Sequence, residues 1–159
     1  MDEREGLAEQ LKAVFGGQNV ERIGDDAFVP LLRLESDIRY GIDEQGVWCL
    51  HSEGEESLRR LSEATAYWFI EWVEHPRQHI EELLEKAAEV HGFDADELVG
   101  SVPVVDLVAG LLASRSLHAC RLALTWPRPT ELRPLRGILK ALADDRGLPD
   151  QIRQLASHM

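Results

Sequence analysis

Cysteine is scarce in this chain, and long hydrophobic runs are missing. The 159 residues include 2 cysteines, Cys49 and Cys120, which lie far apart and each within an apolar segment. Buried free thiols in a reducing compartment explain them better than a disulfide does. No apolar stretch approaches the roughly 18 residues of a membrane span. No basic and apolar signal region opens the chain. We therefore expect a cytoplasmic protein that does not associate with membranes.

Basic residues are scarce in the first part of the chain. Residues 1–97 contain 24 acidic and 9 basic side chains, whereas residues 98–159 contain 5 acidic and 8 basic ones, for a net charge of -12. An acidic field of this kind repels nucleic acid and attracts a basic partner. Direct nucleic-acid binding is therefore not expected. A second interpretation stays open, in which the acidic surface only keeps the protein soluble.

Recognisable catalytic and metal-binding motifs are also missing. His75 and His79 have a spacing that places both on one helical face, but a metal site needs three or four ligands with support around them. Ser114, Ser116 and His118 are close in sequence without a carboxylate or an oxyanion-forming turn. Paired carboxylates on surface loops carry no catalytic signal. The sequence therefore predicts a protein that is not an enzyme and that uses no cofactor and no metal.

The clearest pattern lies between Asp37 and Val73. Alternation from Ile38 to Ile42 predicts a strand with one apolar face. Asp43-Glu44-Gln45-Gly46 has a turn composition in which the glycine can take a positive φ, and Val47–Leu50 predicts the returning strand. These features predict a β-hairpin.

An aromatic segment follows the hairpin. Ser57 can cap a helix, and apolar residues then recur at intervals of three and four. These residues are Leu58, Leu61, Thr65, Trp68 and Trp72. The spacing predicts one long helix that lies across the sheet. Its aromatic stripe is more typical of a core than of a ligand site.

The segments before the hairpin predict a helix and two more strands. Apolar spacing indicates a helix over residues 3–15, which Gly16-Gly17 ends. Residues 19–24 and 27–35 are short and β-rich. Pro30 cannot donate to a strand ladder, so we expect the second strand to be bulged or at an edge.

The rest of the chain has helical patterns. Helices are predicted from Pro76 to Val90, after Asp94, and from Leu117 to Leu124, while Pro103–Ala113 is a buried helix or, alternatively, contains a strand through 102–105. A final helix pair is predicted with Thr130 as the cap of its first member, Gly147 at its end and Pro149 at the start of the second. We expect an α+β fold, a small antiparallel sheet covered by helices and followed by an all-helical half. The predicted division is an acidic α+β domain at 1–92 and a helical region at 93–159.

Part of the chain resembles the SUKH superfamily. The resemblance covers about residues 20–74 and rests on the strand Ile38–Ile42, on Gly46-Val47-Trp48, and on a helix from Leu61-Ser62 through Phe69 to Trp72. It implies a bacterial immunity protein that binds and neutralises a toxin domain, often a nuclease or a deaminase. Such toxins present basic clefts, and complementary charge speeds association.

The predicted interaction surface consists of acidic loop residues. These are Asp25, Asp26, Asp43, Glu44, Glu53, Glu55 and Glu56. The expected partner is a protein, either a toxin domain or an exported substrate. The alternative function is a secretion or assembly chaperone, a small acidic α+β protein acting as a dimer. The sequence does not determine the oligomeric state.

Overall fold

The computed structural model describes residues 3–17 and 19–159, and their fold is α+β, as predicted. The chain forms two compact units. Unit 1 comprises residues 1–61 and 78–102, and unit 2 comprises residues 62–77 and 103–159. The units therefore do not follow the predicted boundary after residue 92. The chain leaves unit 1 after Leu61, returns to it at Gln78, and leaves it again after Val102.

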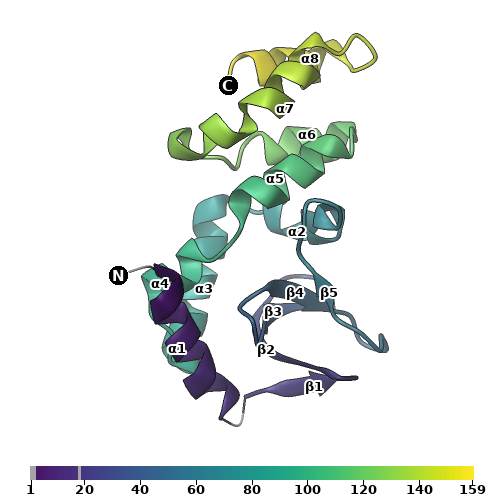
Figure 1. Cartoon of the computed structure of the whole chain (residues 1–159). Helices are drawn as coiled ribbons and strands as arrows, with labels where there is room; N and C mark the ends of the chain where they lie inside the picture. The colour runs from purple at the N-terminus through teal and green to yellow at the C-terminus, as the bar shows by residue number, and fades with distance from the viewer. Residues whose placement is uncertain (1–2, 18) are drawn as a thin grey trace. The chain divides into compact units, whose positions relative to one another are not determined.

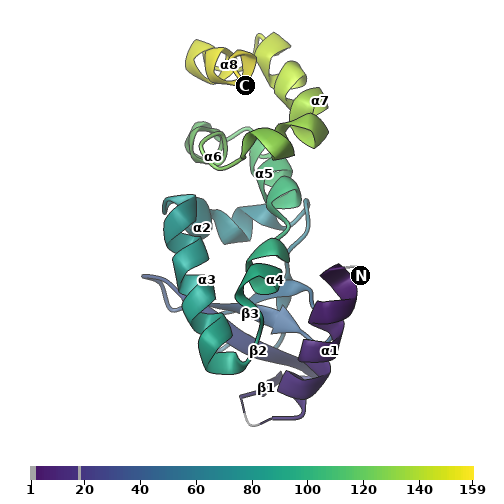
Figure 2. The same cartoon turned by 90° about the vertical axis from the view of Figure 1, so that its left-hand side faces the viewer.

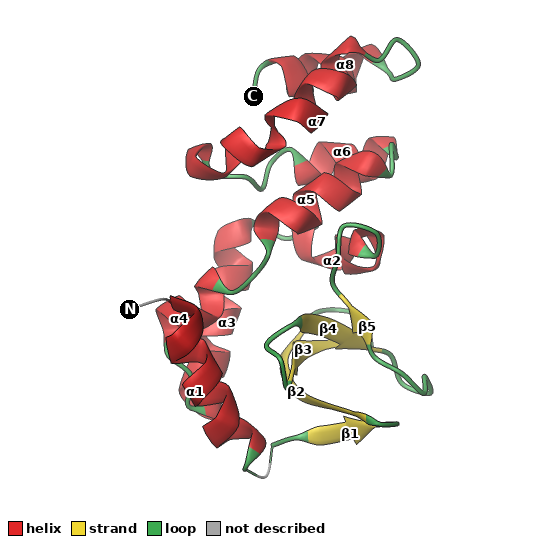
Figure 3. Cartoon of the chain, viewed as in Figure 1, coloured by secondary structure: helices red, strands yellow, loops and turns green. Residues whose placement is uncertain are grey.

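Unit 1 contains a five-stranded antiparallel sheet in which the strand order follows the sequence (Figure 3). The strands are β1 (Glu21–Ile23), β2 (Asp26–Arg33), β3 (Arg39–Asp43), β4 (Trp48–His51) and β5 (Arg59–Arg60). The predicted hairpin is confirmed as β3 and β4, with Tyr40 opposite Leu50 and Gly46 at a φ of 79°. Both edge strands are short.

A β-bulge interrupts the second strand. The pairing of β2 with β3 shifts register between Pro30 and Leu32, which confirms the predicted bulge. Strand β2 pairs with β1 on its other side, so it is not an edge strand. The extra residue, Leu31, breaks the two-residue alternation, and both Leu31 and Leu32 are buried. This position of the sheet therefore turns two neighbouring apolar side chains away from solvent.

Three helices of unit 1 cover one face of the sheet: α1 (Glu3–Phe15), α3 (Arg77–His91) and α4 (Ala95–Gly100) (Figures 1 and 2). The first residue of α3, Arg77, is assigned to unit 2. Trp48 of β4 lies on this face, because its indole donates a hydrogen bond at 3.0 Å to Oγ of Ser101, the residue after α4. Asp94 caps α4, as predicted, because its side chain accepts a hydrogen bond from Glu97 N.

The opposite face of the sheet has a smaller apolar cluster. Phe28, Cys49 and Leu58 are buried together, with Ile23 packed against them. Leu58 precedes β5, so the loop after β4 places an apolar side chain over this face. The polar residues of the same face surround this cluster.

Unit 2 is helical. It contains a 3-10 helix η1 (Ala66–Phe69), α2 (Ile70–Val73), α5 (Val104–Ala113), α6 (Leu117–Ala123), a 3-10 helix η2 (Pro129–Glu131), α7 (Leu132–Asp144) and α8 (Asp150–Ser157). Seven of the ten residues of α5 are buried, so the helical alternative for Pro103–Ala113 is the correct one. Gly110 of α5 faces Glu63 O and Ala66 Cβ so closely that a side chain there would collide with both.

The predicted C-terminal helix pair is present as α7 and α8. Leu135, Leu139 and Leu142 form the buried stripe of α7, and Ile152 and Ala156 are the buried residues of α8. Thr130 does not cap α7, because it lies inside η2. The pair packs on the rest of unit 2 through α5 and α6.

The predicted long helix after Ser57 is wrong over its first half. Arg59 and Arg60 form β5, which pairs Cys49 with Arg60 and Leu50 with Arg59, and helical structure begins only at Ala66. The backbone of Arg59 and Arg60 pairs with β4, although the apolar periodicity of this segment predicted a helix. The aromatic stripe is also divided, since Trp72 is buried while Trp68 is 53% exposed.

Within residues 3–17 and 19–159, no helix combines the length and the apolar character needed to cross a bilayer.

Candidate functional site

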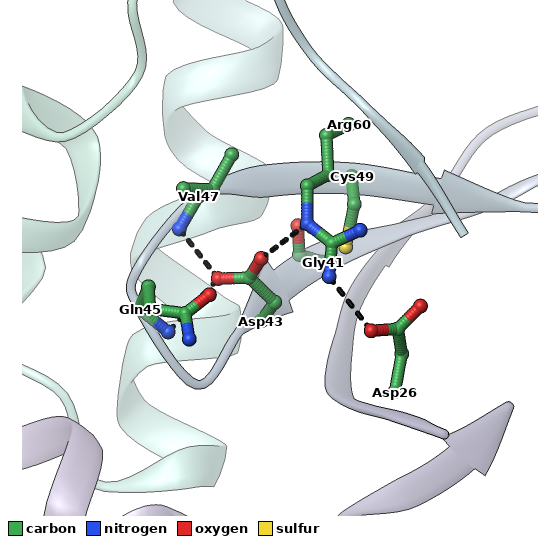
Figure 4. A network of polar contacts seen from close by, with 7 residues as sticks. All are labelled: Asp26, Gly41, Asp43, Gln45, Val47, Cys49 and Arg60. Carbon is green, nitrogen blue, oxygen red and sulfur yellow. Dashed lines mark hydrogen bonds and ion pairs between the residues drawn. The ribbon is translucent and has the colours of Figure 1, made fainter. Parts of the chain in front are cut away.

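The β3–β4 turn is built around the side chain of Asp43. Asp43 Oδ1 accepts hydrogen bonds from Gln45 N and Val47 N, both at 2.9 Å (Figure 4). The backbone closes the same turn, because Asp43 N donates to Val47 O and Gly46 N donates to Asp43 O, both at 3.0 Å. An aspartate that accepts from its own turn fixes the geometry of the loop.

Arg60 of β5 connects this turn to the first hairpin. Its Nε donates to Asp43 Oδ2 at 2.8 Å, and its Nη2 donates to Asp26 Oδ1 at 2.9 Å (Figure 4). The hydrogen bonds to Asp43 and Asp26 raise the pKa of Arg60, so its guanidinium stays charged. One cation therefore holds two carboxylates that lie 17 residues apart in sequence.

Cys49 lies beside this ion-pair network and is fully buried. Its Sγ lies 3.6 Å from Gly41 O. Burial, together with the negative charge of Asp43, raises the pKa of the Cys49 thiol to about 12. Because the thiolate is the reactive form of cysteine, Cys49 is a core thiol and not a nucleophile at neutral pH.

A second polar group on the same face is centred on His51. Arg39 Nη2 donates to His51 Nδ1 at 3.1 Å, and His51 Nε2 donates to Glu55 O at 2.9 Å. Because a guanidinium only donates and a carbonyl only accepts, the imidazole carries its proton on Nε2. Arg39 also lies over the Phe28 ring, 5.6 Å from its centroid, and pairs with Glu21. These contacts anchor the loop after β4 to the sheet.

The structure brings several of the predicted acidic residues together. The β1–β2 turn, which contains Asp25, and the β3–β4 turn, which contains Glu44, lie at the same end of the antiparallel sheet. The loop after β4 leaves the sheet at the opposite end, where His51 pairs with Arg39. Its later part nevertheless approaches the β1–β2 turn, because a Cβ on Gly24 would lie 3.0 Å from Glu56 O. We call the resulting group the acidic turn cluster. Its members are Asp25, Asp26, Asp43, Glu44 and Glu56.

The members of the acidic turn cluster differ in exposure. Asp25, Glu44 and Glu56 are exposed, and their carboxylates have no ion-pair partner among the described residues. Asp43 is 2% exposed and is ion-paired, so it supports the loops and its carboxylate is not at the surface. Asp26 is half-buried against Arg60.

Two predicted site residues lie outside this cluster. Glu53 is exposed in the loop after β4, and Glu55 is half-buried and pairs with Arg59 at 3.0 Å. Sequence reasoning missed Arg60, the residue that assembles the cluster. The adjacent Arg59-Arg60 after an acidic stretch was the available signal, but its partners are remote in sequence.

The remaining chemical candidates have separate structural partners. Ser114 Oγ donates to Leu111 O, Ser116 caps α6, and His118 Nε2 lies 3.7 Å from Glu74 Oε1. The carbonyl of His75 accepts the Trp126 indole N–H at 3.0 Å. In the part of the chain that the structure describes, no three His, Cys, Asp or Glu side chains are grouped closely enough to hold a metal.

No family model, curated protein or solved structure matches this chain. A role for this protein is therefore argued from its own residues and contacts.

Proposed function

We propose that this protein is a non-enzymatic binding protein whose acidic turn cluster contacts a basic surface on a protein partner. The observation that carries the proposal is that three loops of unit 1 with exposed carboxylates, Asp25, Glu44 and Glu56, are linked to one another. Arg60 bridges Asp26 and Asp43, which adjoin the first two of these loops, and the Glu56 carbonyl lies next to Gly24. Arg60 and Asp43 hold two of these loops in place. Charges presented from fixed loops lose little entropy on binding.

We further propose that the partner is a nucleic-acid-processing toxin and that the protein is its immunity protein. Unit 1 contains 21 acidic and 8 basic residues, a charge that complements the basic cleft of such a toxin. The resemblance to the SUKH superfamily supports the same role. Its strand portion coincides with β3 and β4, whereas its helical portion begins only at Ala66. Occlusion of the cleft by carboxylates would exclude the nucleic-acid substrate.

Affinity capture from a lysate of the source cells, followed by mass spectrometry, tests the binding proposal. We expect the wild-type chain to retain a basic protein at low salt. Because surface charge mainly governs association, raising the salt to 0.5 M lowers the amount retained. The triple variant Asp25→Lys, Glu44→Lys, Glu56→Lys loses this protein. Neutralisation is then tested by expressing the captured protein in a bacterial host with and without the chain.

A matched control separates a specific surface from general acidity. Glu82, Glu85 and Glu89 are also exposed in unit 1, on helix α3. Their replacement by lysine changes the net charge by the same amount as the first triple variant and leaves the cluster intact. Equal loss of the partner by both variants, or capture of no basic protein by the wild-type chain, would count against the proposal. A captured protein that is not toxic to the host would contradict the immunity role alone.

A second candidate is a chaperone for an exported protein. Large exposed apolar side chains in unit 2 favour it, because a client in extended form would bind through apolar contacts. Tyr67 is 51% exposed, Trp68 is 53% exposed and Leu117 is 41% exposed. Light scattering separates the two roles, since the chaperone acts as a dimer. If a captured client is lost on Trp68→Ser and retained by the charge-reversal variant, the chaperone role is the correct one.

A further inference from the structure

A pocket in unit 1 lies at the end of β2 opposite to the acidic turn cluster. It has a volume of about 300 Å³ and lies between the end of β2 and the last two turns of α3. Its walls are mainly apolar, formed by Leu31, Leu32 and Leu83. Val90, which is 74% exposed, forms part of the rim. Ligand pockets typically measure roughly 300–1,000 Å³, so this one suits a small ligand with an apolar body.

The β-bulge is what shapes the apolar wall. In a regular strand, Leu31 and Leu32 would point to opposite faces of the sheet. The register shift between Pro30 and Leu32 instead leaves both side chains buried and both lining the pocket. Bulges re-aim side chains in this way and recur beside binding sites.

The two residues with a permanent charge that line the pocket are both basic, whereas the net charge of unit 1 is acidic. Arg33 and Lys86 both line the pocket, within a unit whose acidic residues outnumber the basic ones by 21 to 8. Arg33 pairs with Asp37 at 3.1 Å, but both side chains are largely exposed, at 62% and 84%. An exposed pair of this kind is weak and can exchange for a ligand anion. Lys86 is exposed and has no ion pair within the described residues.

His91 closes α3 and also lines the pocket. Its Nδ1 is fully buried, so a ligand in the pocket does not reach that nitrogen. The polar groups at the pocket that a ligand can reach are therefore those of Arg33 and Lys86.

We propose that this pocket binds a small amphipathic carboxylate, with its chain against Leu31, Leu32 and Leu83 and its anionic head toward Arg33 and Lys86. The apolar walls account for the chain of the ligand, and the two cations account for its anionic head. Charge-assisted hydrogen bonds are stronger than neutral ones, so the head group sets the specificity. This site is independent of the acidic turn cluster and of the proposed partner.

Titration of the full chain with sodium octanoate, followed by amide NMR, tests the proposal. We expect saturable shifts at Leu31 to Arg33 and at Leu83 to His91. Each buried methylene contributes about fourfold to binding, so hexanoate, which is two methylenes shorter, binds roughly fifteenfold more weakly than octanoate. Octanol has the same chain without the charge and also binds about tenfold more weakly, because it loses the charged contacts.

Two double variants with the same charge change provide the controls. Arg33→Gln with Lys86→Gln weakens octanoate about tenfold and leaves octanol unchanged. Lys12→Gln with Arg22→Gln removes two exposed cations of unit 1 that do not line the pocket, and it leaves octanoate binding unchanged. Equal effects of the two double variants, equal binding of octanol and octanoate, or shifts confined to other residues would overturn the proposal. Tighter binding of N-acetyl-leucine than of octanoate would instead assign the pocket to a peptide C-terminus and would also overturn it.

Discussion

The two units of this protein are stabilised by different kinds of contact. Unit 1 has 21 acidic and 8 basic residues, while unit 2 is close to neutral, with 8 acidic and 9 basic ones. The buried polar residues of the described chain, Asp43 and His51, both belong to unit 1, where each fixes a loop. Unit 2 is organised around α5, a helix with apolar residues on nearly all sides. Polar contacts therefore determine loop geometry in unit 1, and close packing determines helix positions in unit 2.

The two units also differ in the kind of surface that they present. Loops held by the buried side chains of Asp43 and His51 present surface charges in fixed positions, and these loops are found in unit 1. The helices of unit 2 instead leave aromatic surface exposed at Tyr67 and Trp68. The comparison predicts that charge changes will affect unit 1 far more than unit 2.

Cysteine labelling gives the largest expected effect, and each unit contains one cysteine. The pKa of Cys49 in unit 1 is raised from 9.0 to about 12, so at pH 8 its thiolate fraction is roughly a thousandfold below that of an unfolded cysteine. Burial also raises the pKa of Cys120 in unit 2. We expect iodoacetamide to label neither thiol in the native protein. Peptide mass spectrometry at increasing urea then shows which unit opens first. Labelling of native Cys49 as fast as in the unfolded chain would contradict its burial.

Two glycines give the next largest effect, and each reports on one unit. A Cβ on Gly41 would collide with the Val29 carbonyl in unit 1, and a Cβ on Gly110 would collide with Glu63 and Ala66 in unit 2. We expect Gly41→Ala and Gly110→Ala each to lower the free energy of unfolding by about 3 kcal/mol. Amide hydrogen exchange shows whether the loss of protection stays within the altered unit.

Gly100 and Gly137 are the matched controls for these substitutions. They lie in helices of unit 1 and unit 2, and an added Cβ at either position meets nothing within 4 Å. Alanine at these positions favours the helix by about 0.5–1 kcal/mol, so both variants should be slightly more stable. If Gly110→Ala behaves like Gly137→Ala, α5 does not pack tightly on Ala66.

Removal of the buried carboxylate of Asp43 has a smaller effect on unit 1. Asp43→Ala leaves Gln45 N, Val47 N and one side of Arg60 without their acceptor. We expect a loss of about 2 kcal/mol, below the cost of breaking a fully buried pair because Arg60 is partly exposed. Asp37→Ala, which removes an exposed partner of Arg33, should change stability by less than about 0.5 kcal/mol. Urea denaturation followed by tryptophan fluorescence measures both, and equal effects would mean that burial of Asp43 is unimportant.

The smallest expected effect is a pH dependence from His91. Desolvation lowers the pKa of His91 below its ordinary value of 6.5, so the unfolded chain binds the proton more readily than the folded one. Its contribution to stability is therefore present above pH 6.5 and is lost as the pH falls through the folded pKa. Urea titrations of the wild type and His91→Gln from pH 7.5 to 5 should show a slightly smaller loss of stability in the variant. Parallel curves would mean that His91 does not contribute.

Local patterns were sufficient to predict the hairpin of β3 and β4, because alternating side chains and a turn glycine are properties of adjacent residues. The same kind of reasoning failed between Leu58 and Thr65. Apolar spacing there also fits a helix, but Arg59 and Arg60 pair with β4, and Arg60 reaches two carboxylates supplied by other turns. Contacts between residues this far apart leave no periodic signal in the sequence.

The candidate site shows the same limit. The exposed loop positions of Asp25, Glu44 and Glu56 follow from turn composition, whereas the buried carboxylate of Asp43 also needs Arg60, which comes from another strand. Nothing in the segment Asp43-Glu44-Gln45-Gly46 distinguishes its first acid from its second. The pocket was also unpredictable, because it needs both the bulge in β2 and the packing of α3 beside it.

The shortness of the outer strands has a consequence for the protein at high concentration. A sheet edge with unpaired backbone groups can pair with the edge of another molecule and begin aggregation. Here one edge is Glu21–Ile23, whose first two residues are charged, and the other consists of two arginines, Arg59 and Arg60. Lateral addition of a second sheet could pair only two or three residues at either edge, and at the β5 edge it would bring arginines together. Short, charged edge strands of this kind disfavour fibril-like association.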